Sequence, residues 1–126
     1  MKLKVLLMIV GCVQVILGLG YLFVPQLFLH AMGHSAPLAD IQYPLGMLAA
    51  RFIVYGGAFI AISNAPYEHR LWILNMIFIQ MIDLGVGVFY TATGVVPLSL
   101  SGFPMFNAVW IAVLLWVWRP RKQLSV

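Results

Sequence analysis

The eight residues 63-SNAPYEHR-70 interrupt an otherwise apolar part of the chain and decide how the segments beside them can fold. Two long apolar stretches flank them, at 43–63 and 70–93. Each is near the ~20 residues that a helix rising ~1.5 Å per residue needs to cross a ~30 Å hydrocarbon layer. Because so short a polar break lets the chain do little more than reverse, we expect two antiparallel membrane-spanning helices joined by a turn.

Two further apolar stretches, 3–24 and 103–118, lie outside this hairpin, and the second is the shortest of the four. It needs its flanking turns to complete a span. Across the chain 63% of residues are hydrophobic and 8% are charged, whereas a soluble domain has roughly 25% charged residues. Because four spans use up nearly the whole chain, the sequence predicts one all-α transmembrane domain, residues 1–126, folded as a four-helix bundle.

The positively charged residues that flank the predicted spans all lie on one side of the predicted membrane. The connections 25–43 and 94–102 contain neither lysine nor arginine, and the cations flanking the spans are Lys2, Lys4, Arg70, Arg119, Arg121 and Lys122. By the positive-inside rule, both termini and the 63–70 turn lie in the cytoplasm. The net charge of +4 is then a signal of topology, and we expect membrane lipids rather than nucleic acid as partners.

Small residues and prolines predict how the spans pack and what connects them. Gly11 and Gly18 lie on one face of the first span, and the second span carries Gly46 with Ala50 and Gly57 with Ala61 at small-x-x-x-small spacing. Such positions allow helices in a membrane to approach closely. After the first span, Pro25 and Gly33 bound a short amphipathic segment, for which we expect a helix lying in the outer interface.

Arg51 and Asp83 are the ionisable residues well inside the predicted spans. Each would cost roughly 2.5 to 3.5 kcal/mol if left alone at the centre of a membrane. Arg51 lies 16 residues before Tyr67, near the middle of the turn, and Asp83 lies 16 residues after it. The hairpin therefore places both at similar depth in the outer half of the membrane, where we expect them to pair.

Other polar residues share the helical faces of this predicted pair. The candidate ligand-binding residues are Arg51, Asp83, Gln80, Tyr55, Tyr90 and Gln14. Paired, Arg51 and Asp83 would keep their charges, since opposite charges at close range favour the ionised forms. Three interpretations stay open. The cluster is a structural lock between helices, a cavity lining for a small ligand such as a quinone head group or for a proton path, or a contact with a partner subunit.

His30 and His34 are one helical turn apart, a spacing that can bring two imidazoles to one metal ion. Gly33 interrupts the helix between them, and a metal would need further ligands such as Asp40 or Met32. We favour a histidine pair at the interface without a metal, and keep His30 and His34 as weak metal-ligand candidates.

Common catalytic motifs are absent from the sequence. It has no Gly-rich phosphate loop, no nucleophile elbow, no paired carboxylates and no Cys-x-x-Cys. We therefore assign no catalytic residue. Whether the protein is an enzyme stays open, with a non-enzyme favoured.

Four short spans, the segment 22-LFVPQLFLHAMG-33, and an arginine followed by glycines in 50-ARFIVYGGAFI-60 resemble the DoxX-like group of small bacterial membrane proteins. The resemblance covers the layout of nearly the whole chain. Some members of that group are linked to quinone-associated sulfur oxidation or to redox-protective membrane complexes. The resemblance implies a bacterial protein and an association with quinones or redox chemistry, and it transfers no catalytic residue.

Together these observations lead to three hypotheses for a protein of the bacterial inner (cytoplasmic) membrane. The first is a non-catalytic accessory subunit of a larger membrane complex. The second is a protein that binds a small molecule, a quinone or lipid, at the level of Arg51 and Asp83. The third, an oligomeric transporter, is less favoured because only one level of the bundle is polar.

Overall fold

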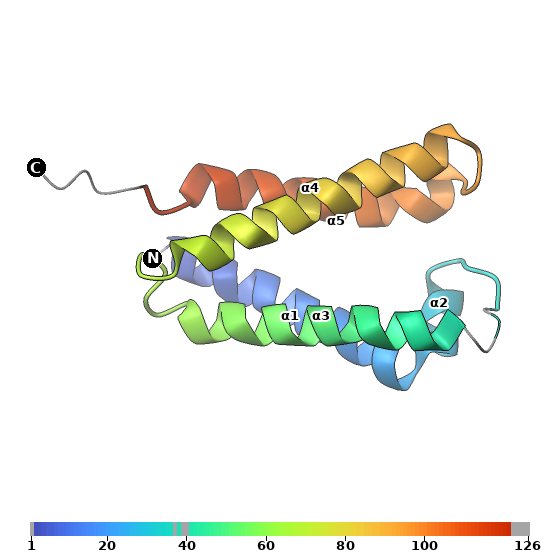
Figure 1. The fold of residues 1–126 in the computed structure, drawn as a ribbon, viewed down its shortest axis with the longest axis horizontal. Coiled ribbons are helices and arrows are strands. Elements are labelled where there is room, and N and C mark those ends of the chain that lie inside the picture. Colours follow the sequence, from blue (N-terminus) through green and yellow to red (C-terminus); the bar gives the residue numbers. More distant parts are fainter. Residues whose placement is uncertain (1, 37, 39–40, 122–126) are drawn as a thin grey trace, which may run out of the picture. The chain divides into compact units, whose positions relative to one another are not determined.

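A computed structural model describes residues 2–36, 38 and 41–121 of the chain, and this described part is helical without a strand. Asp40 and Lys122, considered above as a metal ligand and as a topology signal, lie outside the described residues. The helices are α1 (Lys2–Phe23), α2 (Pro25–Ala31), α3 (Gln42–Ile62), α4 (Arg70–Ala92) and α5 (Leu98–Trp118) (Figure 1).

Four of these helices, α1, α3, α4 and α5, are long and apolar enough to cross a membrane. Their lengths run from 21 to 23 residues and their mean hydropathy from 1.8 to 2.4. The prediction of an all-α chain with four long apolar helices is therefore confirmed. The bounds of α1, α3 and α4 fall within one residue of the predicted spans.

Helix α5 differs from its prediction, because it begins at Leu98 and not near residue 103. Pro97 caps it in an extended conformation, with φ −75° and ψ 157°. The Ser101 hydroxyl lies back toward the Pro97 carbonyl oxygen, 3.3 Å away. The proline inside the helix, Pro104, lies in its second turn, where it removes one backbone hydrogen bond. The residues that made 98–102 look like a loop are thus accommodated at the start of a helix.

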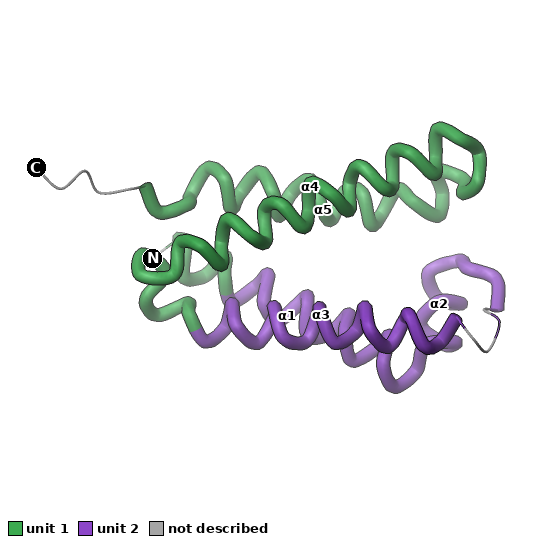
Figure 2. The backbone as a smooth tube through the Cα atoms, viewed as in Figure 1, with its two compact units in different colours: residues 1–7, 62–126 green, residues 8–61 purple. Residues whose placement is uncertain are grey.

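The chain divides into two compact units, drawn in different colours in Figure 2. Unit 1 comprises residues 1–7 and 62–126, and holds the α4–α5 hairpin. Unit 2 comprises residues 8–61, and holds most of α1 together with α2 and α3. The predicted single domain stays a prediction.

In unit 2, α1 and α3 come into contact through glycines. A Cβ added to Gly11 would lie 2.7 Å from the Gly56 carbonyl oxygen, and one added to Gly18 would lie 2.9 Å from that of Ala49. The predicted close approach at Gly11 and Gly18 is confirmed. On α3, however, the contact uses Gly56. At the predicted contact positions Gly46 and Gly57, an added Cβ would meet no atom within 4 Å from other parts of the described chain.

Helix α2 is the short helix predicted after the first span. Pro25 occupies its first turn, and the chain leaves it through Met32 and Gly33, which has a φ of 89°. Aromatic packing holds it against α1, since the rings of Phe28 and Tyr21 meet edge to face at 4.9 Å. The Tyr21 ring also stacks on Phe52 of α3 at 6.0 Å.

In unit 1, α4 and α5 form an antiparallel pair. Near their connection the hydroxyls of Thr91 and Ser101 are 2.6 Å apart, and Thr91 also donates to the Gly87 carbonyl. A Cβ on Gly87 would lie 2.6 Å from the Met105 side chain, so the two helices are closely packed there. At the other end, Arg70 Nε donates to the Pro120 carbonyl at 2.9 Å.

Candidate functional site

The six candidate ligand-binding residues are distributed over both compact units. Gln14, Arg51 and Tyr55 belong to unit 2, whereas Gln80, Asp83 and Tyr90 belong to unit 1. The pairing of Arg51 with Asp83 would join the two units and stays a prediction. Both residues are partly buried, and the Arg51 guanidinium carbon lies 5.3 Å from the centre of the Phe52 ring.

The helix bounds sharpen the depth argument for this predicted pair. Arg51 lies eleven residues before Ile62, where α3 ends, and Asp83 lies thirteen residues after Arg70, where α4 begins. At a rise of ~1.5 Å per residue the two positions differ by roughly 3 Å in their distance from the turn. The two residues thus lie at similar distances along their helices from the turn, and their similar depth in a membrane stays a prediction.

Gln14 of α1 is the most unusual member of the set. Its side chain is 2% exposed, and its Nε2 has no hydrogen-bond partner within the described part of the chain. A buried donor left unsatisfied costs roughly 1–3 kcal/mol. An acceptor from outside the chain, such as a water or the carbonyl oxygen of a ligand, would remove this cost. Of the six candidate residues, Gln14 therefore gives the most direct indication of a bound ligand or water.

Gln80 and Tyr90 of α4 have very different surroundings. Gln80 is buried and donates from Nε2 to the Met76 sulfur at 3.2 Å. A thioether is a weak acceptor, so this amide retains capacity for a better partner. Tyr90 is 45% exposed, and its ring packs edge to face on Phe89 at 5.3 Å.

The two candidate metal ligands lie on either side of a helix end. His30 is exposed near the end of α2, and His34 follows the turn at Gly33, with its backbone N–H donating to the Leu29 carbonyl. Among residues 2–36, 38 and 41–121, no three His, Cys, Asp or Glu residues come together as a metal site would need. Since zinc takes at least three protein ligands, these two histidines alone do not make a zinc site.

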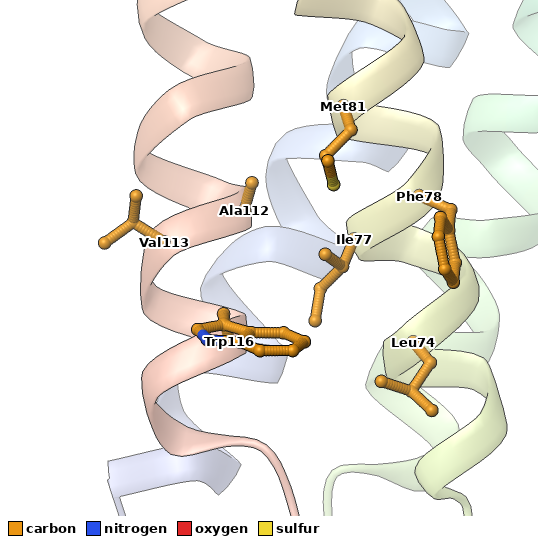
Figure 3. A pocket seen from close by; sticks show the side chains of 7 residues that line it. All are labelled: Leu74, Ile77, Phe78, Met81, Ala112, Val113 and Trp116. Atoms are coloured by element: carbon orange, nitrogen blue, oxygen red, sulfur yellow. The ribbon is translucent and has the colours of Figure 1, made fainter.

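Unit 1 contains an apolar groove that was not predicted from the sequence. It has a volume of about 510 Å³ and lies between α4 and α5 (Figure 3). Its wall is formed by Leu74, Ile77, Phe78 and Met81 of α4 with Ala112, Val113 and Trp116 of α5. The one feature of the sequence that could have indicated this groove is Ala112, a short side chain within an otherwise bulky apolar run.

A second hollow of about 400 Å³ lies at the turn between α3 and α4. Its lining is polar in part and includes both a cation and an anion, Lys4 and Glu68. Asn64 and Tyr67 also line it. This mixture is typical of a solvated turn.

Comparison with known proteins finds no family model, no curated protein and no solved structure that matches this chain. The resemblance to the DoxX-like group stays a prediction, and the function has to be argued from the residues themselves.

Proposed function

We propose that this protein is a non-catalytic accessory subunit of a larger complex in the bacterial inner membrane. In this proposal α1, α3, α4 and α5 span the membrane as a four-helix bundle. The lysines and arginines support an orientation with both termini and the 63–70 turn in the cytoplasm. Helix α2 then lies in the outer interface.

The observation that carries this proposal is a face of α3 made of small residues, Gly46, Ala50, Gly57 and Ala61, which we call the open α3 face. The side chains of Ala50 and Ala61 are exposed. Apart from the backbone of α3 itself and the adjoining residues, no atom of the described residues lies within 4 Å of a Cβ added at Gly46 or Gly57. The chain's own α1–α3 contact uses the neighbouring face, at Ala49 and Gly56.

Within unit 2, glycine on the open α3 face makes no contact that the packing of α1 with α3 requires. In a helix interior it costs about 1 kcal/mol relative to alanine. In a membrane, helices associate by close packing and not by hydrophobic exclusion from water, and small residues four apart are the positions at which backbones meet. A helix of another subunit packed on the open α3 face would offset the cost of Gly57.

The proposal is tested by the mass and composition of the protein purified in a mild detergent. We expect the wild type to be recovered with at least one different subunit in fixed ratio. Gly57→Leu should release the chain at its own mass of 14.0 kDa, because the bulkier side chain blocks the open α3 face.

The matched control is Gly85→Leu, at a glycine of α4 where an added Cβ would likewise meet no atom within 4 Å from other parts of the described chain. This variant should keep the complex intact. A wild type that is recovered alone would contradict the proposal. So would a symmetric assembly of this chain only, which would favour an oligomeric transporter instead.

The unpaired amide of Gln14 favours a second candidate function, the binding of a quinone or lipid at the level of Arg51 and Asp83. The buried Gln14 amide has no acceptor within the described chain, and a quinone carbonyl would supply one. The test is extraction and identification of the small molecule that stays with the purified protein. Loss of that molecule from a folded Asp83→Asn variant would support a site, and loss of the folded protein would support a structural lock.

A further inference from the structure

We propose that the apolar groove of unit 1 binds one acyl chain of an anionic phospholipid, whose phosphate lies against Arg119 and Arg70. This site is separate from the Arg51 and Asp83 level and does not depend on the proposed subunit function.

The groove has the shape and chemistry that an acyl chain requires. Its volume of about 510 Å³ falls within the roughly 300–1,000 Å³ of ligand pockets. Every lining side chain is apolar except for the indole N–H of Trp116. Phe78, Met81 and Val113 are each more than half exposed, so the groove opens to the surroundings of the hairpin. Figure 3 shows the Trp116 ring extending from α5 toward Leu74 and Ile77.

Two arginines lie at one end of this groove. The Arg119 guanidinium carbon lies 3.5 Å from the centre of the Trp116 ring, so the cation rests directly on a wall of the groove. Arg70 Nε donates to the carbonyl of Pro120, the residue after Arg119, which brings both guanidiniums to the same end of the hairpin. A guanidinium carries five N–H donors suited to phosphate oxygens, and this bond of Arg70 uses one of them.

The groove is short enough to lie within one leaflet of a membrane. It begins at Leu74, one turn after Arg70, and extends to Met81, seven residues further along α4. Seven residues of helix rise roughly 10 Å, less than half of a ~30 Å hydrocarbon layer. An acyl chain entering beside the arginines would therefore fill the groove without leaving its own leaflet.

Charge decides between a lipid and a second copy of this chain as the occupant. The whole chain contains three acidic residues, Asp40, Glu68 and Asp83. A second copy in the same orientation would bring Glu68 to this level together with its own Lys4, Arg70 and Arg119, and so a net positive charge. An anionic phospholipid brings a net negative charge to the level where Arg70 and Arg119 end the hairpin. The groove and its cations thus fit a lipid with an anionic head group.

Quenching of tryptophan fluorescence by brominated acyl chains tests the proposal on the intact protein in vesicles. Brominated phosphatidylglycerol and brominated phosphatidylcholine are compared at equal mole fraction. We expect brominated phosphatidylglycerol to quench at a lower mole fraction than brominated phosphatidylcholine. Each arginine that contacts the phosphate should contribute roughly a fivefold preference for phosphatidylglycerol. The preference should fall as salt is raised, because salt screens exposed charges.

Three variants locate the site. Arg119→Gln should remove about fivefold of the preference. Ala112→Phe should fill the groove and weaken quenching by both lipids. The matched control Arg121→Gln, at an exposed arginine beyond the groove, should change neither the preference for phosphatidylglycerol nor the extent of quenching. Equal quenching of the wild type by the two lipids would overturn the proposal. So would an Ala112→Phe variant whose fluorescence is quenched as in the wild type but whose oligomeric state changes.

Discussion

Gly11 of α1 and Gly56 of α3 meet backbone to backbone. A Cβ on either glycine would lie 2.7 Å from the carbonyl oxygen of the other. The contact is reciprocal, and each nearest atom belongs to the backbone of a helix, which cannot rotate away as a flexible side chain can. This relationship fixes how closely α1 and α3 can pack.

Gly11→Ala should destabilise the protein by about 1–3 kcal/mol, the usual cost of inserting a methyl group into a closely packed contact. The measurement is loss of helical circular dichroism as the detergent-solubilised protein is titrated with a denaturing detergent. Gly85→Ala is the matched control, since that glycine of α4 is open and alanine is the better helix former. A Gly11→Ala variant as stable as Gly85→Ala would show that the close approach is wrong.

Ser101→Ala tests the hydroxyl pair that joins α4 to α5. It removes the 2.6 Å contact with Thr91, and interhelical hydrogen bonds in membranes contribute on average about 0.6 kcal/mol and at most about 1.7. We expect destabilisation in that range by the same titration. Thr93→Ala is the control, because its exposed hydroxyl bonds only within its own helix, to the Phe89 carbonyl. Equal effects of both substitutions would contradict a role for the pair.

The sequence predicted the helices far better than it predicted their contacts. Apolar length alone placed α1, α3 and α4 to within one residue, since the hydrocarbon thickness sets that length. It failed at the start of α5, where serine, glycine and proline favoured a loop. The Ser101 hydroxyl has the Thr91 hydroxyl at 2.6 Å and the Pro97 carbonyl oxygen at 3.3 Å, which shows why a polar segment can be helical there.

The glycine contacts show a second limit of prediction from the sequence. Gly11 and Gly18 were identified as contact positions, but periodicity could not tell Gly56 from Gly57, which are neighbours about 100° apart around α3. That choice depends on which face of α3 meets α1. The apolar groove was missed for a related reason, because it arises from how α4 and α5 side chains of different length fit together.

Gln14→Met tests whether the buried amide is unsatisfied in the isolated protein. Methionine has a similar unbranched shape, and removing an unpaired donor should relieve roughly 1–3 kcal/mol. We therefore expect the variant, freed of small molecules, to be more stable than the wild type. It should also retain less of any quinone that the wild type carries. A clear loss of stability would mean that the amide has a partner within the chain.

The predicted pairing of Arg51 with Asp83 is testable by a double-mutant cycle with Arg51→Gln and Asp83→Asn. Residues in direct contact typically show a coupling free energy of roughly 0.5–3 kcal/mol, whereas distant residues are additive within about 0.5. We expect coupling, so the double variant should be more stable than the sum of the single losses implies. Simple additivity would place the two side chains apart.

The central claim, that another subunit packs on the open α3 face, is tested most directly by photo-crosslinking in intact membranes. A photoreactive residue replaces Val54, which is exposed on α3 between Ala50 and Gly57, and in a control it replaces Ile16, which is exposed on α1. We predict a crosslink from position 54 to a different membrane protein, and none from position 16. Adducts from position 54 with lipid alone, or only with a second copy of this chain, would contradict the claim.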